Sequence, residues 1–285
     1  MNLNLKTMLV VLLPLLIGSV GCSSLAPQAQ LPQANNTSAS DASASSEPFR
    51  YDAYAALLSR YVDEKGLVDY TGLQADAESL RAFNQSLGQV SPATFQAWSE
   101  AEQIAFLINA YNAFTLQSII DQTPIKASIR DIPGVWRIRK FELAGESKTL
   151  DNIEHQTLRK LYQEPRIHAA VNCSAISCPV LRTEPYTGEK LNTQLDEQVQ
   201  RWLTSSEGLR IDRANNTVYL SQIFDWFGED WSEQYAMQSG FSGNDKERAV
   251  LNFVSQYVSP EERDYLQKGG YQVKYLEYNW ALNQQ

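Results

Sequence analysis

The sequence predicts an α+β fold, namely a single mixed domain with a buried central helix and short antiparallel strands. Apolar residues recur at helical spacing in some segments and alternate with polar residues in others, without a regular exchange between the two patterns. This irregular order argues against a doubly wound α/β sheet. After residue 48 we find neither a second linker nor an internal repeat, so we expect the domain to cover residues 49–285.

The expected elements follow from this spacing together with capping and turn residues. Helices are expected over residues 49–62, 73–87, from 91 onward for a short stretch, 99–120, 151–161, 190–203, 246–257 and 260–266. Strands are expected over residues 67–70, 136–143 with a turn at 145, 166–171, 209–212, 217–220 and 271–276. Ser99 with Glu102, and Asp151 with Glu154, have the spacing of helix-start residues, and Asn215-Asn216 has the composition of a hairpin turn.

The expected helix over residues 99–120 is apolar on nearly all sides, which predicts that it is the buried centre of the fold. Asn109 and Asn112 are three residues apart and therefore lie on one side of it. A buried amide is costly unless it is hydrogen-bonded. Two interpretations are open: the amides tie loops to the helix, or they orient groups beneath an active site.

The N-terminus indicates export. Lys6 precedes an apolar run over residues 8–17, which is too short to span a bilayer, and small residues follow before Cys22. Residues 1–21 resemble a bacterial lipoprotein signal peptide, with an ordinary secretory signal as the alternative. The resemblance implies palmitate or similar acyl chains on Cys22, and an outer-membrane lipoprotein that faces the periplasm. Residues 22–48 are rich in Ser, Ala, Gln and Pro, and we expect them to be a flexible linker.

Composition excludes several classes of protein. The chain has 285 residues, of which 43% are hydrophobic and 20% charged, with a formal net charge of -9. It is therefore neither collagen-like nor wholly disordered, and we expect no nucleic-acid partner because an acidic surface repels phosphates. The expected partners are the membrane, through the lipid on Cys22, and an unknown envelope protein, peptide or glycan. No cofactor is expected, because the sequence contains no phosphate-binding glycine-rich loop.

The residues with reactive side chains are scarce and clustered. The chain has three Cys and two His, and His155, His168, Cys173 and Cys178 all fall within 24 residues. Independent placement would produce such clustering roughly a few times in a thousand. We expect residues 172–179 to form a loop at the end of a strand, which is a common location for functional groups.

Several stretches resemble a known family. They are Asn109-Ala110-Tyr111-Asn112, Asp151-Asn152-Ile153-Glu154-His155, Arg166-Ile167-His168, Asn172-Cys173 and Ser177-Cys178-Pro179. Together they resemble the domain of unknown function family 547 (DUF547), with agreement from Tyr61-Val62 to Tyr278-Asn279-Trp280. The resemblance implies that Asn109, Asn112, Glu154, His155, His168, Cys173, Cys178 and Pro179 are motif positions, without assigning their roles. Some members of this family carry glutaredoxin-related labels. Four residues separate the two cysteines of this chain, so it contains no Cys-x-x-Cys motif and its sequence does not support such a label.

Three interpretations of the cluster compete. In the first, Cys173 and Cys178 form a structural disulfide, as is typical of exported proteins. In the second, Cys173 is a thiolate nucleophile with His155 as its base, Glu154 or an Asn as the orienting group, and His168 as a supporting group. Loop N–H groups would then stabilise an oxyanion during acyl transfer. In the third, two His and two Cys bind a metal, although their spacing matches no zinc motif.

The sequence therefore predicts an uncharacterised envelope lipoprotein with a Cys/His site for cysteine-dependent acyl transfer or hydrolysis. The alternative is a non-catalytic binding or scaffold lipoprotein with a structural Cys173–Cys178 disulfide. The aromatic and acidic run over residues 224–231 has the composition of a sugar or peptide platform, but we interpret it as core because buried aromatic clusters are commoner. Trp136 and Trp280 are interpreted as packing residues.

Overall fold

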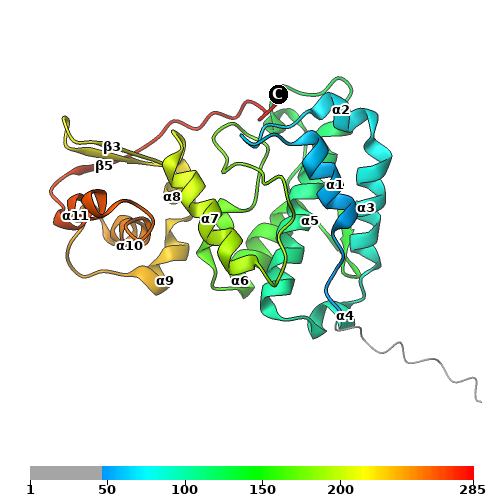
Figure 1. The fold of residues 1–285 in the computed structure, drawn as a ribbon, viewed down its shortest axis with the longest axis horizontal. Coiled ribbons are helices and arrows are strands. Elements are labelled where there is room, and N and C mark those ends of the chain that lie inside the picture. Colours follow the sequence, from blue (N-terminus) through cyan, green and yellow to red (C-terminus); the bar gives the residue numbers. More distant parts are fainter. Residues whose placement is uncertain (1–46) are drawn as a thin grey trace, which may run out of the picture. The chain divides into compact units, whose positions relative to one another are not determined.

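The computed structural model describes residues 47–285. The expected signal peptide, Cys22 and nearly all of the expected linker lie outside the described residues. The α-helices are α1 (Asp52–Tyr61), α2 (Tyr70–Ala75), α3 (Ala77–Gln89), α4 (Pro92–Ala97), α5 (Glu100–Ile120), α6 (Arg159–Leu161), α7 (Leu191–Thr204), α8 (Gln222–Phe227), α9 (Ser232–Tyr235), α10 (Asp245–Val254) and α11 (Pro260–Lys268) (Figure 1). The other helical turns are η1 (Ile129–Asp131), η2 (Asn152–Leu158), η3 (Pro165–Ala169) and η4 (Gly228–Trp231), and the strands are β1 (Phe141–Leu143), β2 (Glu146–Lys148), β3 (Leu209–Asp212), β4 (Thr217–Leu220) and β5 (Gln272–Tyr275).

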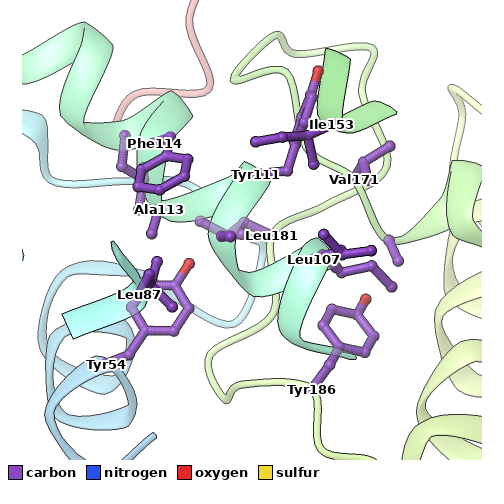
Figure 2. Close-up of a cluster of buried hydrophobic side chains, with 14 of the residues drawn as sticks. Tyr54, Leu87, Leu107, Tyr111, Ala113, Phe114, Ile153, Val171, Leu181 and Tyr186 are labelled. Carbon is purple, nitrogen blue, oxygen red and sulfur yellow. The ribbon is translucent and has the colours of Figure 1, made fainter. Parts of the chain in front are cut away.

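Helix α5 forms the centre of the first hydrophobic core. Every residue from Ile104 to Ile120 is buried, which confirms the prediction of a buried central helix. The helix begins where expected, since the Ser99 hydroxyl accepts a hydrogen bond of 3.2 Å from the Glu102 N–H. It contacts α2, α3, α7 and η2. Figure 2 shows Leu107 and Phe114 among side chains contributed by earlier helices and by later loops.

A second hydrophobic core lies around α7, α8, α10 and a three-stranded sheet, at the other end of the ribbon in Figure 1. The expected hairpin across Asn215-Asn216 is confirmed, because β3 pairs antiparallel with β4. Strand β5 instead pairs parallel with β4, which corrects the expectation of antiparallel strands alone. Its direction follows from the long helical crossover through α8 to α11, since parallel neighbours need such a connection.

Three expected strands are wrong in detail. Residues 166–171 lie in and after the 3-10 helix η3, and their only backbone partners are local, as in the 2.9 Å bond from the Val171 N–H to the Ile167 carbonyl. Pro165 begins this turn with a fixed φ, and none of the strands among residues 47–285 pairs with it. Residues 67–70 make only isolated bridges before α2 begins, and the hairpin after residue 136 is limited to β1 and β2.

The C-terminal segment after β5 joins the two cores. It returns from the sheet toward α2 (Figure 1), where Gln284 bridges Val68. On the way, Leu282 bridges Ala175 in the cysteine loop. Within residues 47–285, no helix has both the length and the apolar character needed to cross a bilayer.

Candidate functional site

A cavity of about 610 Å³ brings the scarce residues together. Glu154, His155, His168, Cys173 and Cys178 all contribute to its wall, although they come from a π-helix, a 3-10 helix and a loop. The rest of the lining is formed by Tyr111, Arg130, Ile132, Pro133, Gly134, Val135, Trp136, Arg137, Ile138, Asp151, Val171, Ile223, Trp226, Phe227, Tyr278 and Trp280. The expected strand over residues 166–171 would have separated His168 from Cys173, whereas the observed turn lets both reach one cavity.

The two cysteines form a disulfide in the wall of the cavity, with their Cα atoms 6.2 Å apart. Cys178 is 6% exposed, and Cys173 is partly exposed. The Cys173 N–H donates to the Cys178 sulfur at 2.9 Å. The Tyr278 hydroxyl lies 3.2 Å from the Cys173 sulfur and must be the donor, because a disulfide sulfur carries no hydrogen.

Five backbone N–H groups of this loop, including that of Cys173 described above, donate within the protein. The loop donors and their acceptors are Ser174 to the Asn172 side chain at 2.8 Å, Ile176 to the Ala281 carbonyl at 2.9 Å, Ser177 to the Asn279 carbonyl at 3.2 Å, and Cys178 to the Ala175 carbonyl at 3.0 Å. These contacts weigh against the expectation that the loop forms an oxyanion hole, because the C-terminal segment and the loop itself already accept from these five N–H groups.

Glu154 and His155 lie side by side on η2, which is a π-helix. A π-helix has more residues per turn than an α-helix, so successive side chains are rotated less and both can face one cavity. The carboxyl of Glu154 is buried, with one oxygen 3.9 Å from His155 Nδ1. Burial, followed by the charge of Glu154, raises the pKa of Tyr111 and of Tyr278 well above the usual range for tyrosine.

Arg159 contacts the ring of His155. Its Nη1 lies 3.1 Å from His155 Nδ1. A guanidinium can only donate, so Nδ1 is the acceptor in a hydrogen bond between these two groups. Nε2 lies 3.9 Å from an oxygen of Asp151. Arg159 therefore already occupies Nδ1, one of the two nitrogens with which His155 would accept a proton as a general base.

His168 is buried at the far end of the same network. Its Nε2 is 2.7 Å from Asp230 Oδ2, and its ring stacks on Phe227 at 4.8 Å between centroids. Asp230 also binds Arg159 through two contacts of 2.6 and 2.9 Å. Burial alone would raise the pKa of Asp230, but the hydrogen bonds and charges of His168 and Arg159 lower it to about 2. A chain of contacts thus connects His155, Arg159, Asp230 and His168.

The two asparagines of α5 tie loops to the helix, as the first interpretation of their role expected. Asn109 donates to the Tyr186 carbonyl at 2.7 Å and accepts from its N–H at 3.0 Å. Asn112 donates to the Ala170 carbonyl at 3.0 Å and accepts from the Asn172 N–H at 2.7 Å. Neither lines the cavity, but Asn112 holds the segment that leads into Cys173.

Asn172 in turn holds the loop closed, because its side chain donates to the Pro179 carbonyl at 2.7 Å. The motif residue Pro179 therefore acts here through its backbone oxygen. Within residues 47–285, no group of three His, Cys, Asp or Glu side chains is placed to hold a metal ion. The metal interpretation of the cluster thus finds no ligand set in the described part of the chain.

An aromatic wall that the sequence did not lead us to predict lines part of the cavity. Trp226 is 40% exposed and stacks on Trp280 with centroids 5.7 Å apart, while Tyr278 packs against both. We had interpreted the run over residues 224–231 as core. Phe224 and Trp231 are indeed buried, but Trp226 and Phe227 line the cavity. The mixture of acidic and aromatic residues in this run was the signal that could have revealed the wall.

Comparison with known proteins yields one family. Residues 95–203 match the family model described as a protein of unknown function, DUF547. The matched segment contains Asn109, Asn112, Glu154, His155 and both loop cysteines, whereas the aromatic wall after residue 203 lies beyond it. No curated protein and no solved structure matches the chain.

Proposed function

We propose that the cavity is the binding site of an envelope lipoprotein for a small amphiphilic ligand, in a chain whose residues 95–203 match the family model of unknown function DUF547. The observation that carries this proposal is the cavity of about 610 Å³, in which an aromatic wall surrounds a few polar groups. Sites for small molecules typically have this size and this mixture of lining residues.

The lining indicates the chemistry of the ligand. Trp226, Tyr278 and Trp280 offer flat apolar faces for an aromatic or aliphatic body. Glu154 would accept a hydrogen bond from a hydroxyl or amine of the ligand. Arg130 lies over Trp280 at 5.2 Å and forms no ion pair with a carboxylate among the described residues, so it would attract an anionic end. Arg137, by contrast, is already 3.4 Å from Asp151.

Binding can be tested with the dye anilinonaphthalene sulfonate, which has an aromatic body and one negative charge. Its affinity is measured by energy transfer from tryptophan to the dye. Replacing Trp226→Ala should weaken binding roughly tenfold, because the exposed face of the wall is lost. Leu161 is a control, since it is 66% exposed but does not line the cavity. Equal affinities for Trp226→Ala and Leu161→Ala would contradict the proposed site.

Cysteine-dependent acyl transfer is the second candidate, because Cys173, His155 and Glu154 line one cavity. Three observations weigh against it: the sulfur is bonded to Cys178, Arg159 contacts His155 Nδ1, and five loop N–H groups already have partners. A reduced protein that cleaves aryl esters, and loses this activity in Cys173→Ser and in His155→Gln, would make this candidate the better one. Failure of the reduced protein to cleave them would remove it.

Anchoring by a lipid on Cys22 is part of the same proposal. The disulfide supports export, because such bonds persist in oxidising compartments. Replacing Cys22→Ser should release the protein from the membrane fraction and abolish incorporation of labelled palmitate. If both the membrane association and the labelling survive this change, the lipoprotein assignment is wrong, whereas the binding proposal is tested separately by the dye.

A further inference from the structure

We propose that the Cys173–Cys178 disulfide is redox-active and exchanges with small thiol compounds that enter the cavity. This activity goes beyond the binding of an amphiphilic ligand. It requires only that a thiol can reach Cys173, so it can succeed or fail independently of the binding function.

The two cysteine residues differ in exposure. Cys173 is partly exposed, whereas Cys178 is 6% exposed, although both contribute to the wall of the cavity. A thiolate attacks one sulfur of a disulfide and expels the other, so the reachable sulfur decides the direction of the reaction. We therefore assign Cys173 as the sulfur that is attacked and Cys178 as the leaving group.

Each sulfur already has a hydrogen-bond donor that would stabilise it as a thiolate. The Cys173 N–H lies 2.9 Å from the Cys178 sulfur, and the Tyr278 hydroxyl lies 3.2 Å from the Cys173 sulfur. Hydrogen bonds to a charged acceptor are stronger than those to a neutral one, so both contacts strengthen when the disulfide is reduced. They favour the dithiol form and the departure of Cys178.

Reduction of the disulfide by small thiols takes two exchange steps. The thiolate of a first small thiol attacks the Cys173 sulfur, the bond to Cys178 breaks, and its electron pair remains on the Cys178 sulfur. A second thiolate then attacks the small-molecule sulfur of the mixed disulfide and releases a small-molecule disulfide and the Cys173 thiolate. Two electrons pass from the two thiols to the protein, and the two protons that the thiols lose are available to the two cysteines.

The assignment of the attacked sulfur is tested with two single variants of the protein, each incubated with oxidised glutathione. In Cys178→Ser the remaining Cys173 should form a mixed disulfide roughly ten times faster than Cys178 does in Cys173→Ser, because Cys173 is reachable from the cavity. Equal rates, or no mixed disulfide in either variant, would overturn the assignment. Mass spectrometry of the intact chain provides the measurement, and circular dichroism confirms that each variant is folded.

The redox equilibrium is tested in buffers of graded reduced to oxidised glutathione, with trapping of free thiols. We expect the native disulfide to equilibrate, and Tyr278→Phe to shift the equilibrium roughly tenfold toward the disulfide through loss of the hydroxyl donor. Tyr275→Phe is the matched control, since the Tyr275 hydroxyl contacts Glu247 at 3.3 Å and not the cavity. A disulfide that resists reduced glutathione until urea unfolds the protein is a structural disulfide only. Equal effects of Tyr278→Phe and Tyr275→Phe would contradict the role of the Tyr278 hydroxyl as a donor to the Cys173 thiolate.

Discussion

Helix α5 is buried whereas the wall of the cavity is partly exposed, and different interactions hold the two in place. From Ile104 to Ile120 the helix is buried on every side and packs mainly through apolar side chains. The part of the wall that carries the His and Cys residues consists of a π-helix, a 3-10 helix and a loop, and single hydrogen bonds such as those of Asn112 and Asn172 hold the loop. Apolar packing is non-directional, whereas each hydrogen bond requires a specific partner.

The difference predicts how the two regions respond to substitution. Loss of a side chain from the core should lower the free energy of unfolding while the folded molecules keep their cavity. Loss of a hydrogen bond that holds the wall should lower the free energy of unfolding and also weaken the binding of a ligand in the cavity. The expected loss in the free energy of unfolding is largest in the core and smallest at the aromatic wall.

The largest loss is expected in the core. Phe106 is fully buried, with the rings of Phe49, Phe95 and Trp98 5.1 to 5.7 Å away. Replacing Phe106→Ala should lower the free energy of unfolding by about 3–5 kcal/mol, measured in urea, because the cavity left behind loses these contacts. Dye affinity should be unchanged under conditions in which the variant is folded. A loss below about 1 kcal/mol would contradict the central role of α5.

The two asparagines provide the sharpest test of the comparison. Replacing either Asn109→Ala or Asn112→Ala leaves a backbone carbonyl and an N–H without their partner, and should cost about 2–3 kcal/mol. Only Asn112→Ala should also weaken dye binding, because it releases the segment that leads into Cys173. If the two variants bind the dye equally well, Asn112 does not position the wall.

An acid-dependent loss of stability is expected from Asp230. The pKa of its carboxyl is about 2 in the folded protein, against about 3.9 in an unfolded chain. A lowered pKa contributes stability that is present above the unfolded value and is lost as the pH falls through the folded one. We therefore expect about 2 kcal/mol to disappear between about pH 4 and pH 2.

Replacing Asp230→Asn should remove this part of the acid dependence, as measured by urea unfolding at graded pH. Asp245 provides the matched control, because its side chain is 98% exposed and lies outside the cavity. An unchanged acid profile in Asp230→Asn would show that the contacts with His168 and Arg159 do not stabilise the fold.

The smallest change in stability is expected at the aromatic wall. Trp226 is 40% exposed, so Trp226→Ala should cost about 1 kcal/mol or less, even though it removes most of the dye binding. A loss as large as that of Phe106→Ala would mean that the wall is a continuation of the core and not a preformed binding surface.

Parts of the fold follow from local pattern. The buried helix over residues 99–120 and the hairpin of β3 and β4 were predicted from apolar spacing and from the turn at Asn215-Asn216, and both are confirmed. The strand over residues 166–171 was wrong, because alternation alone cannot reveal whether a neighbouring strand exists. Only the tertiary structure shows that this segment ends in local turns.

The sequence predicted the region of the candidate site but not all of the residues that form it. The clustering of His155, His168, Cys173 and Cys178 marked the correct region, since all four line one cavity. Arg159 and Asp230 were not predicted, although Arg159 contacts the ring of His155 and Asp230 contacts the ring of His168. Asp230 is 62 positions from His168 and 71 from Arg159, and no short-range spacing indicates such contacts, whereas Arg159 is only four positions from His155.

The sequence by itself determined which segment is buried at the centre, where the hairpin turns, and in which 24 residues the reactive side chains lie. Composition and spacing suffice for these features because they depend on neighbours along the chain. Only the tertiary structure decided that Tyr278 approaches Cys173 and that Trp226 and Trp280 complete the cavity. Such contacts arise when the C-terminal segment packs back on the cysteine loop, so they depend on the packing of distant segments.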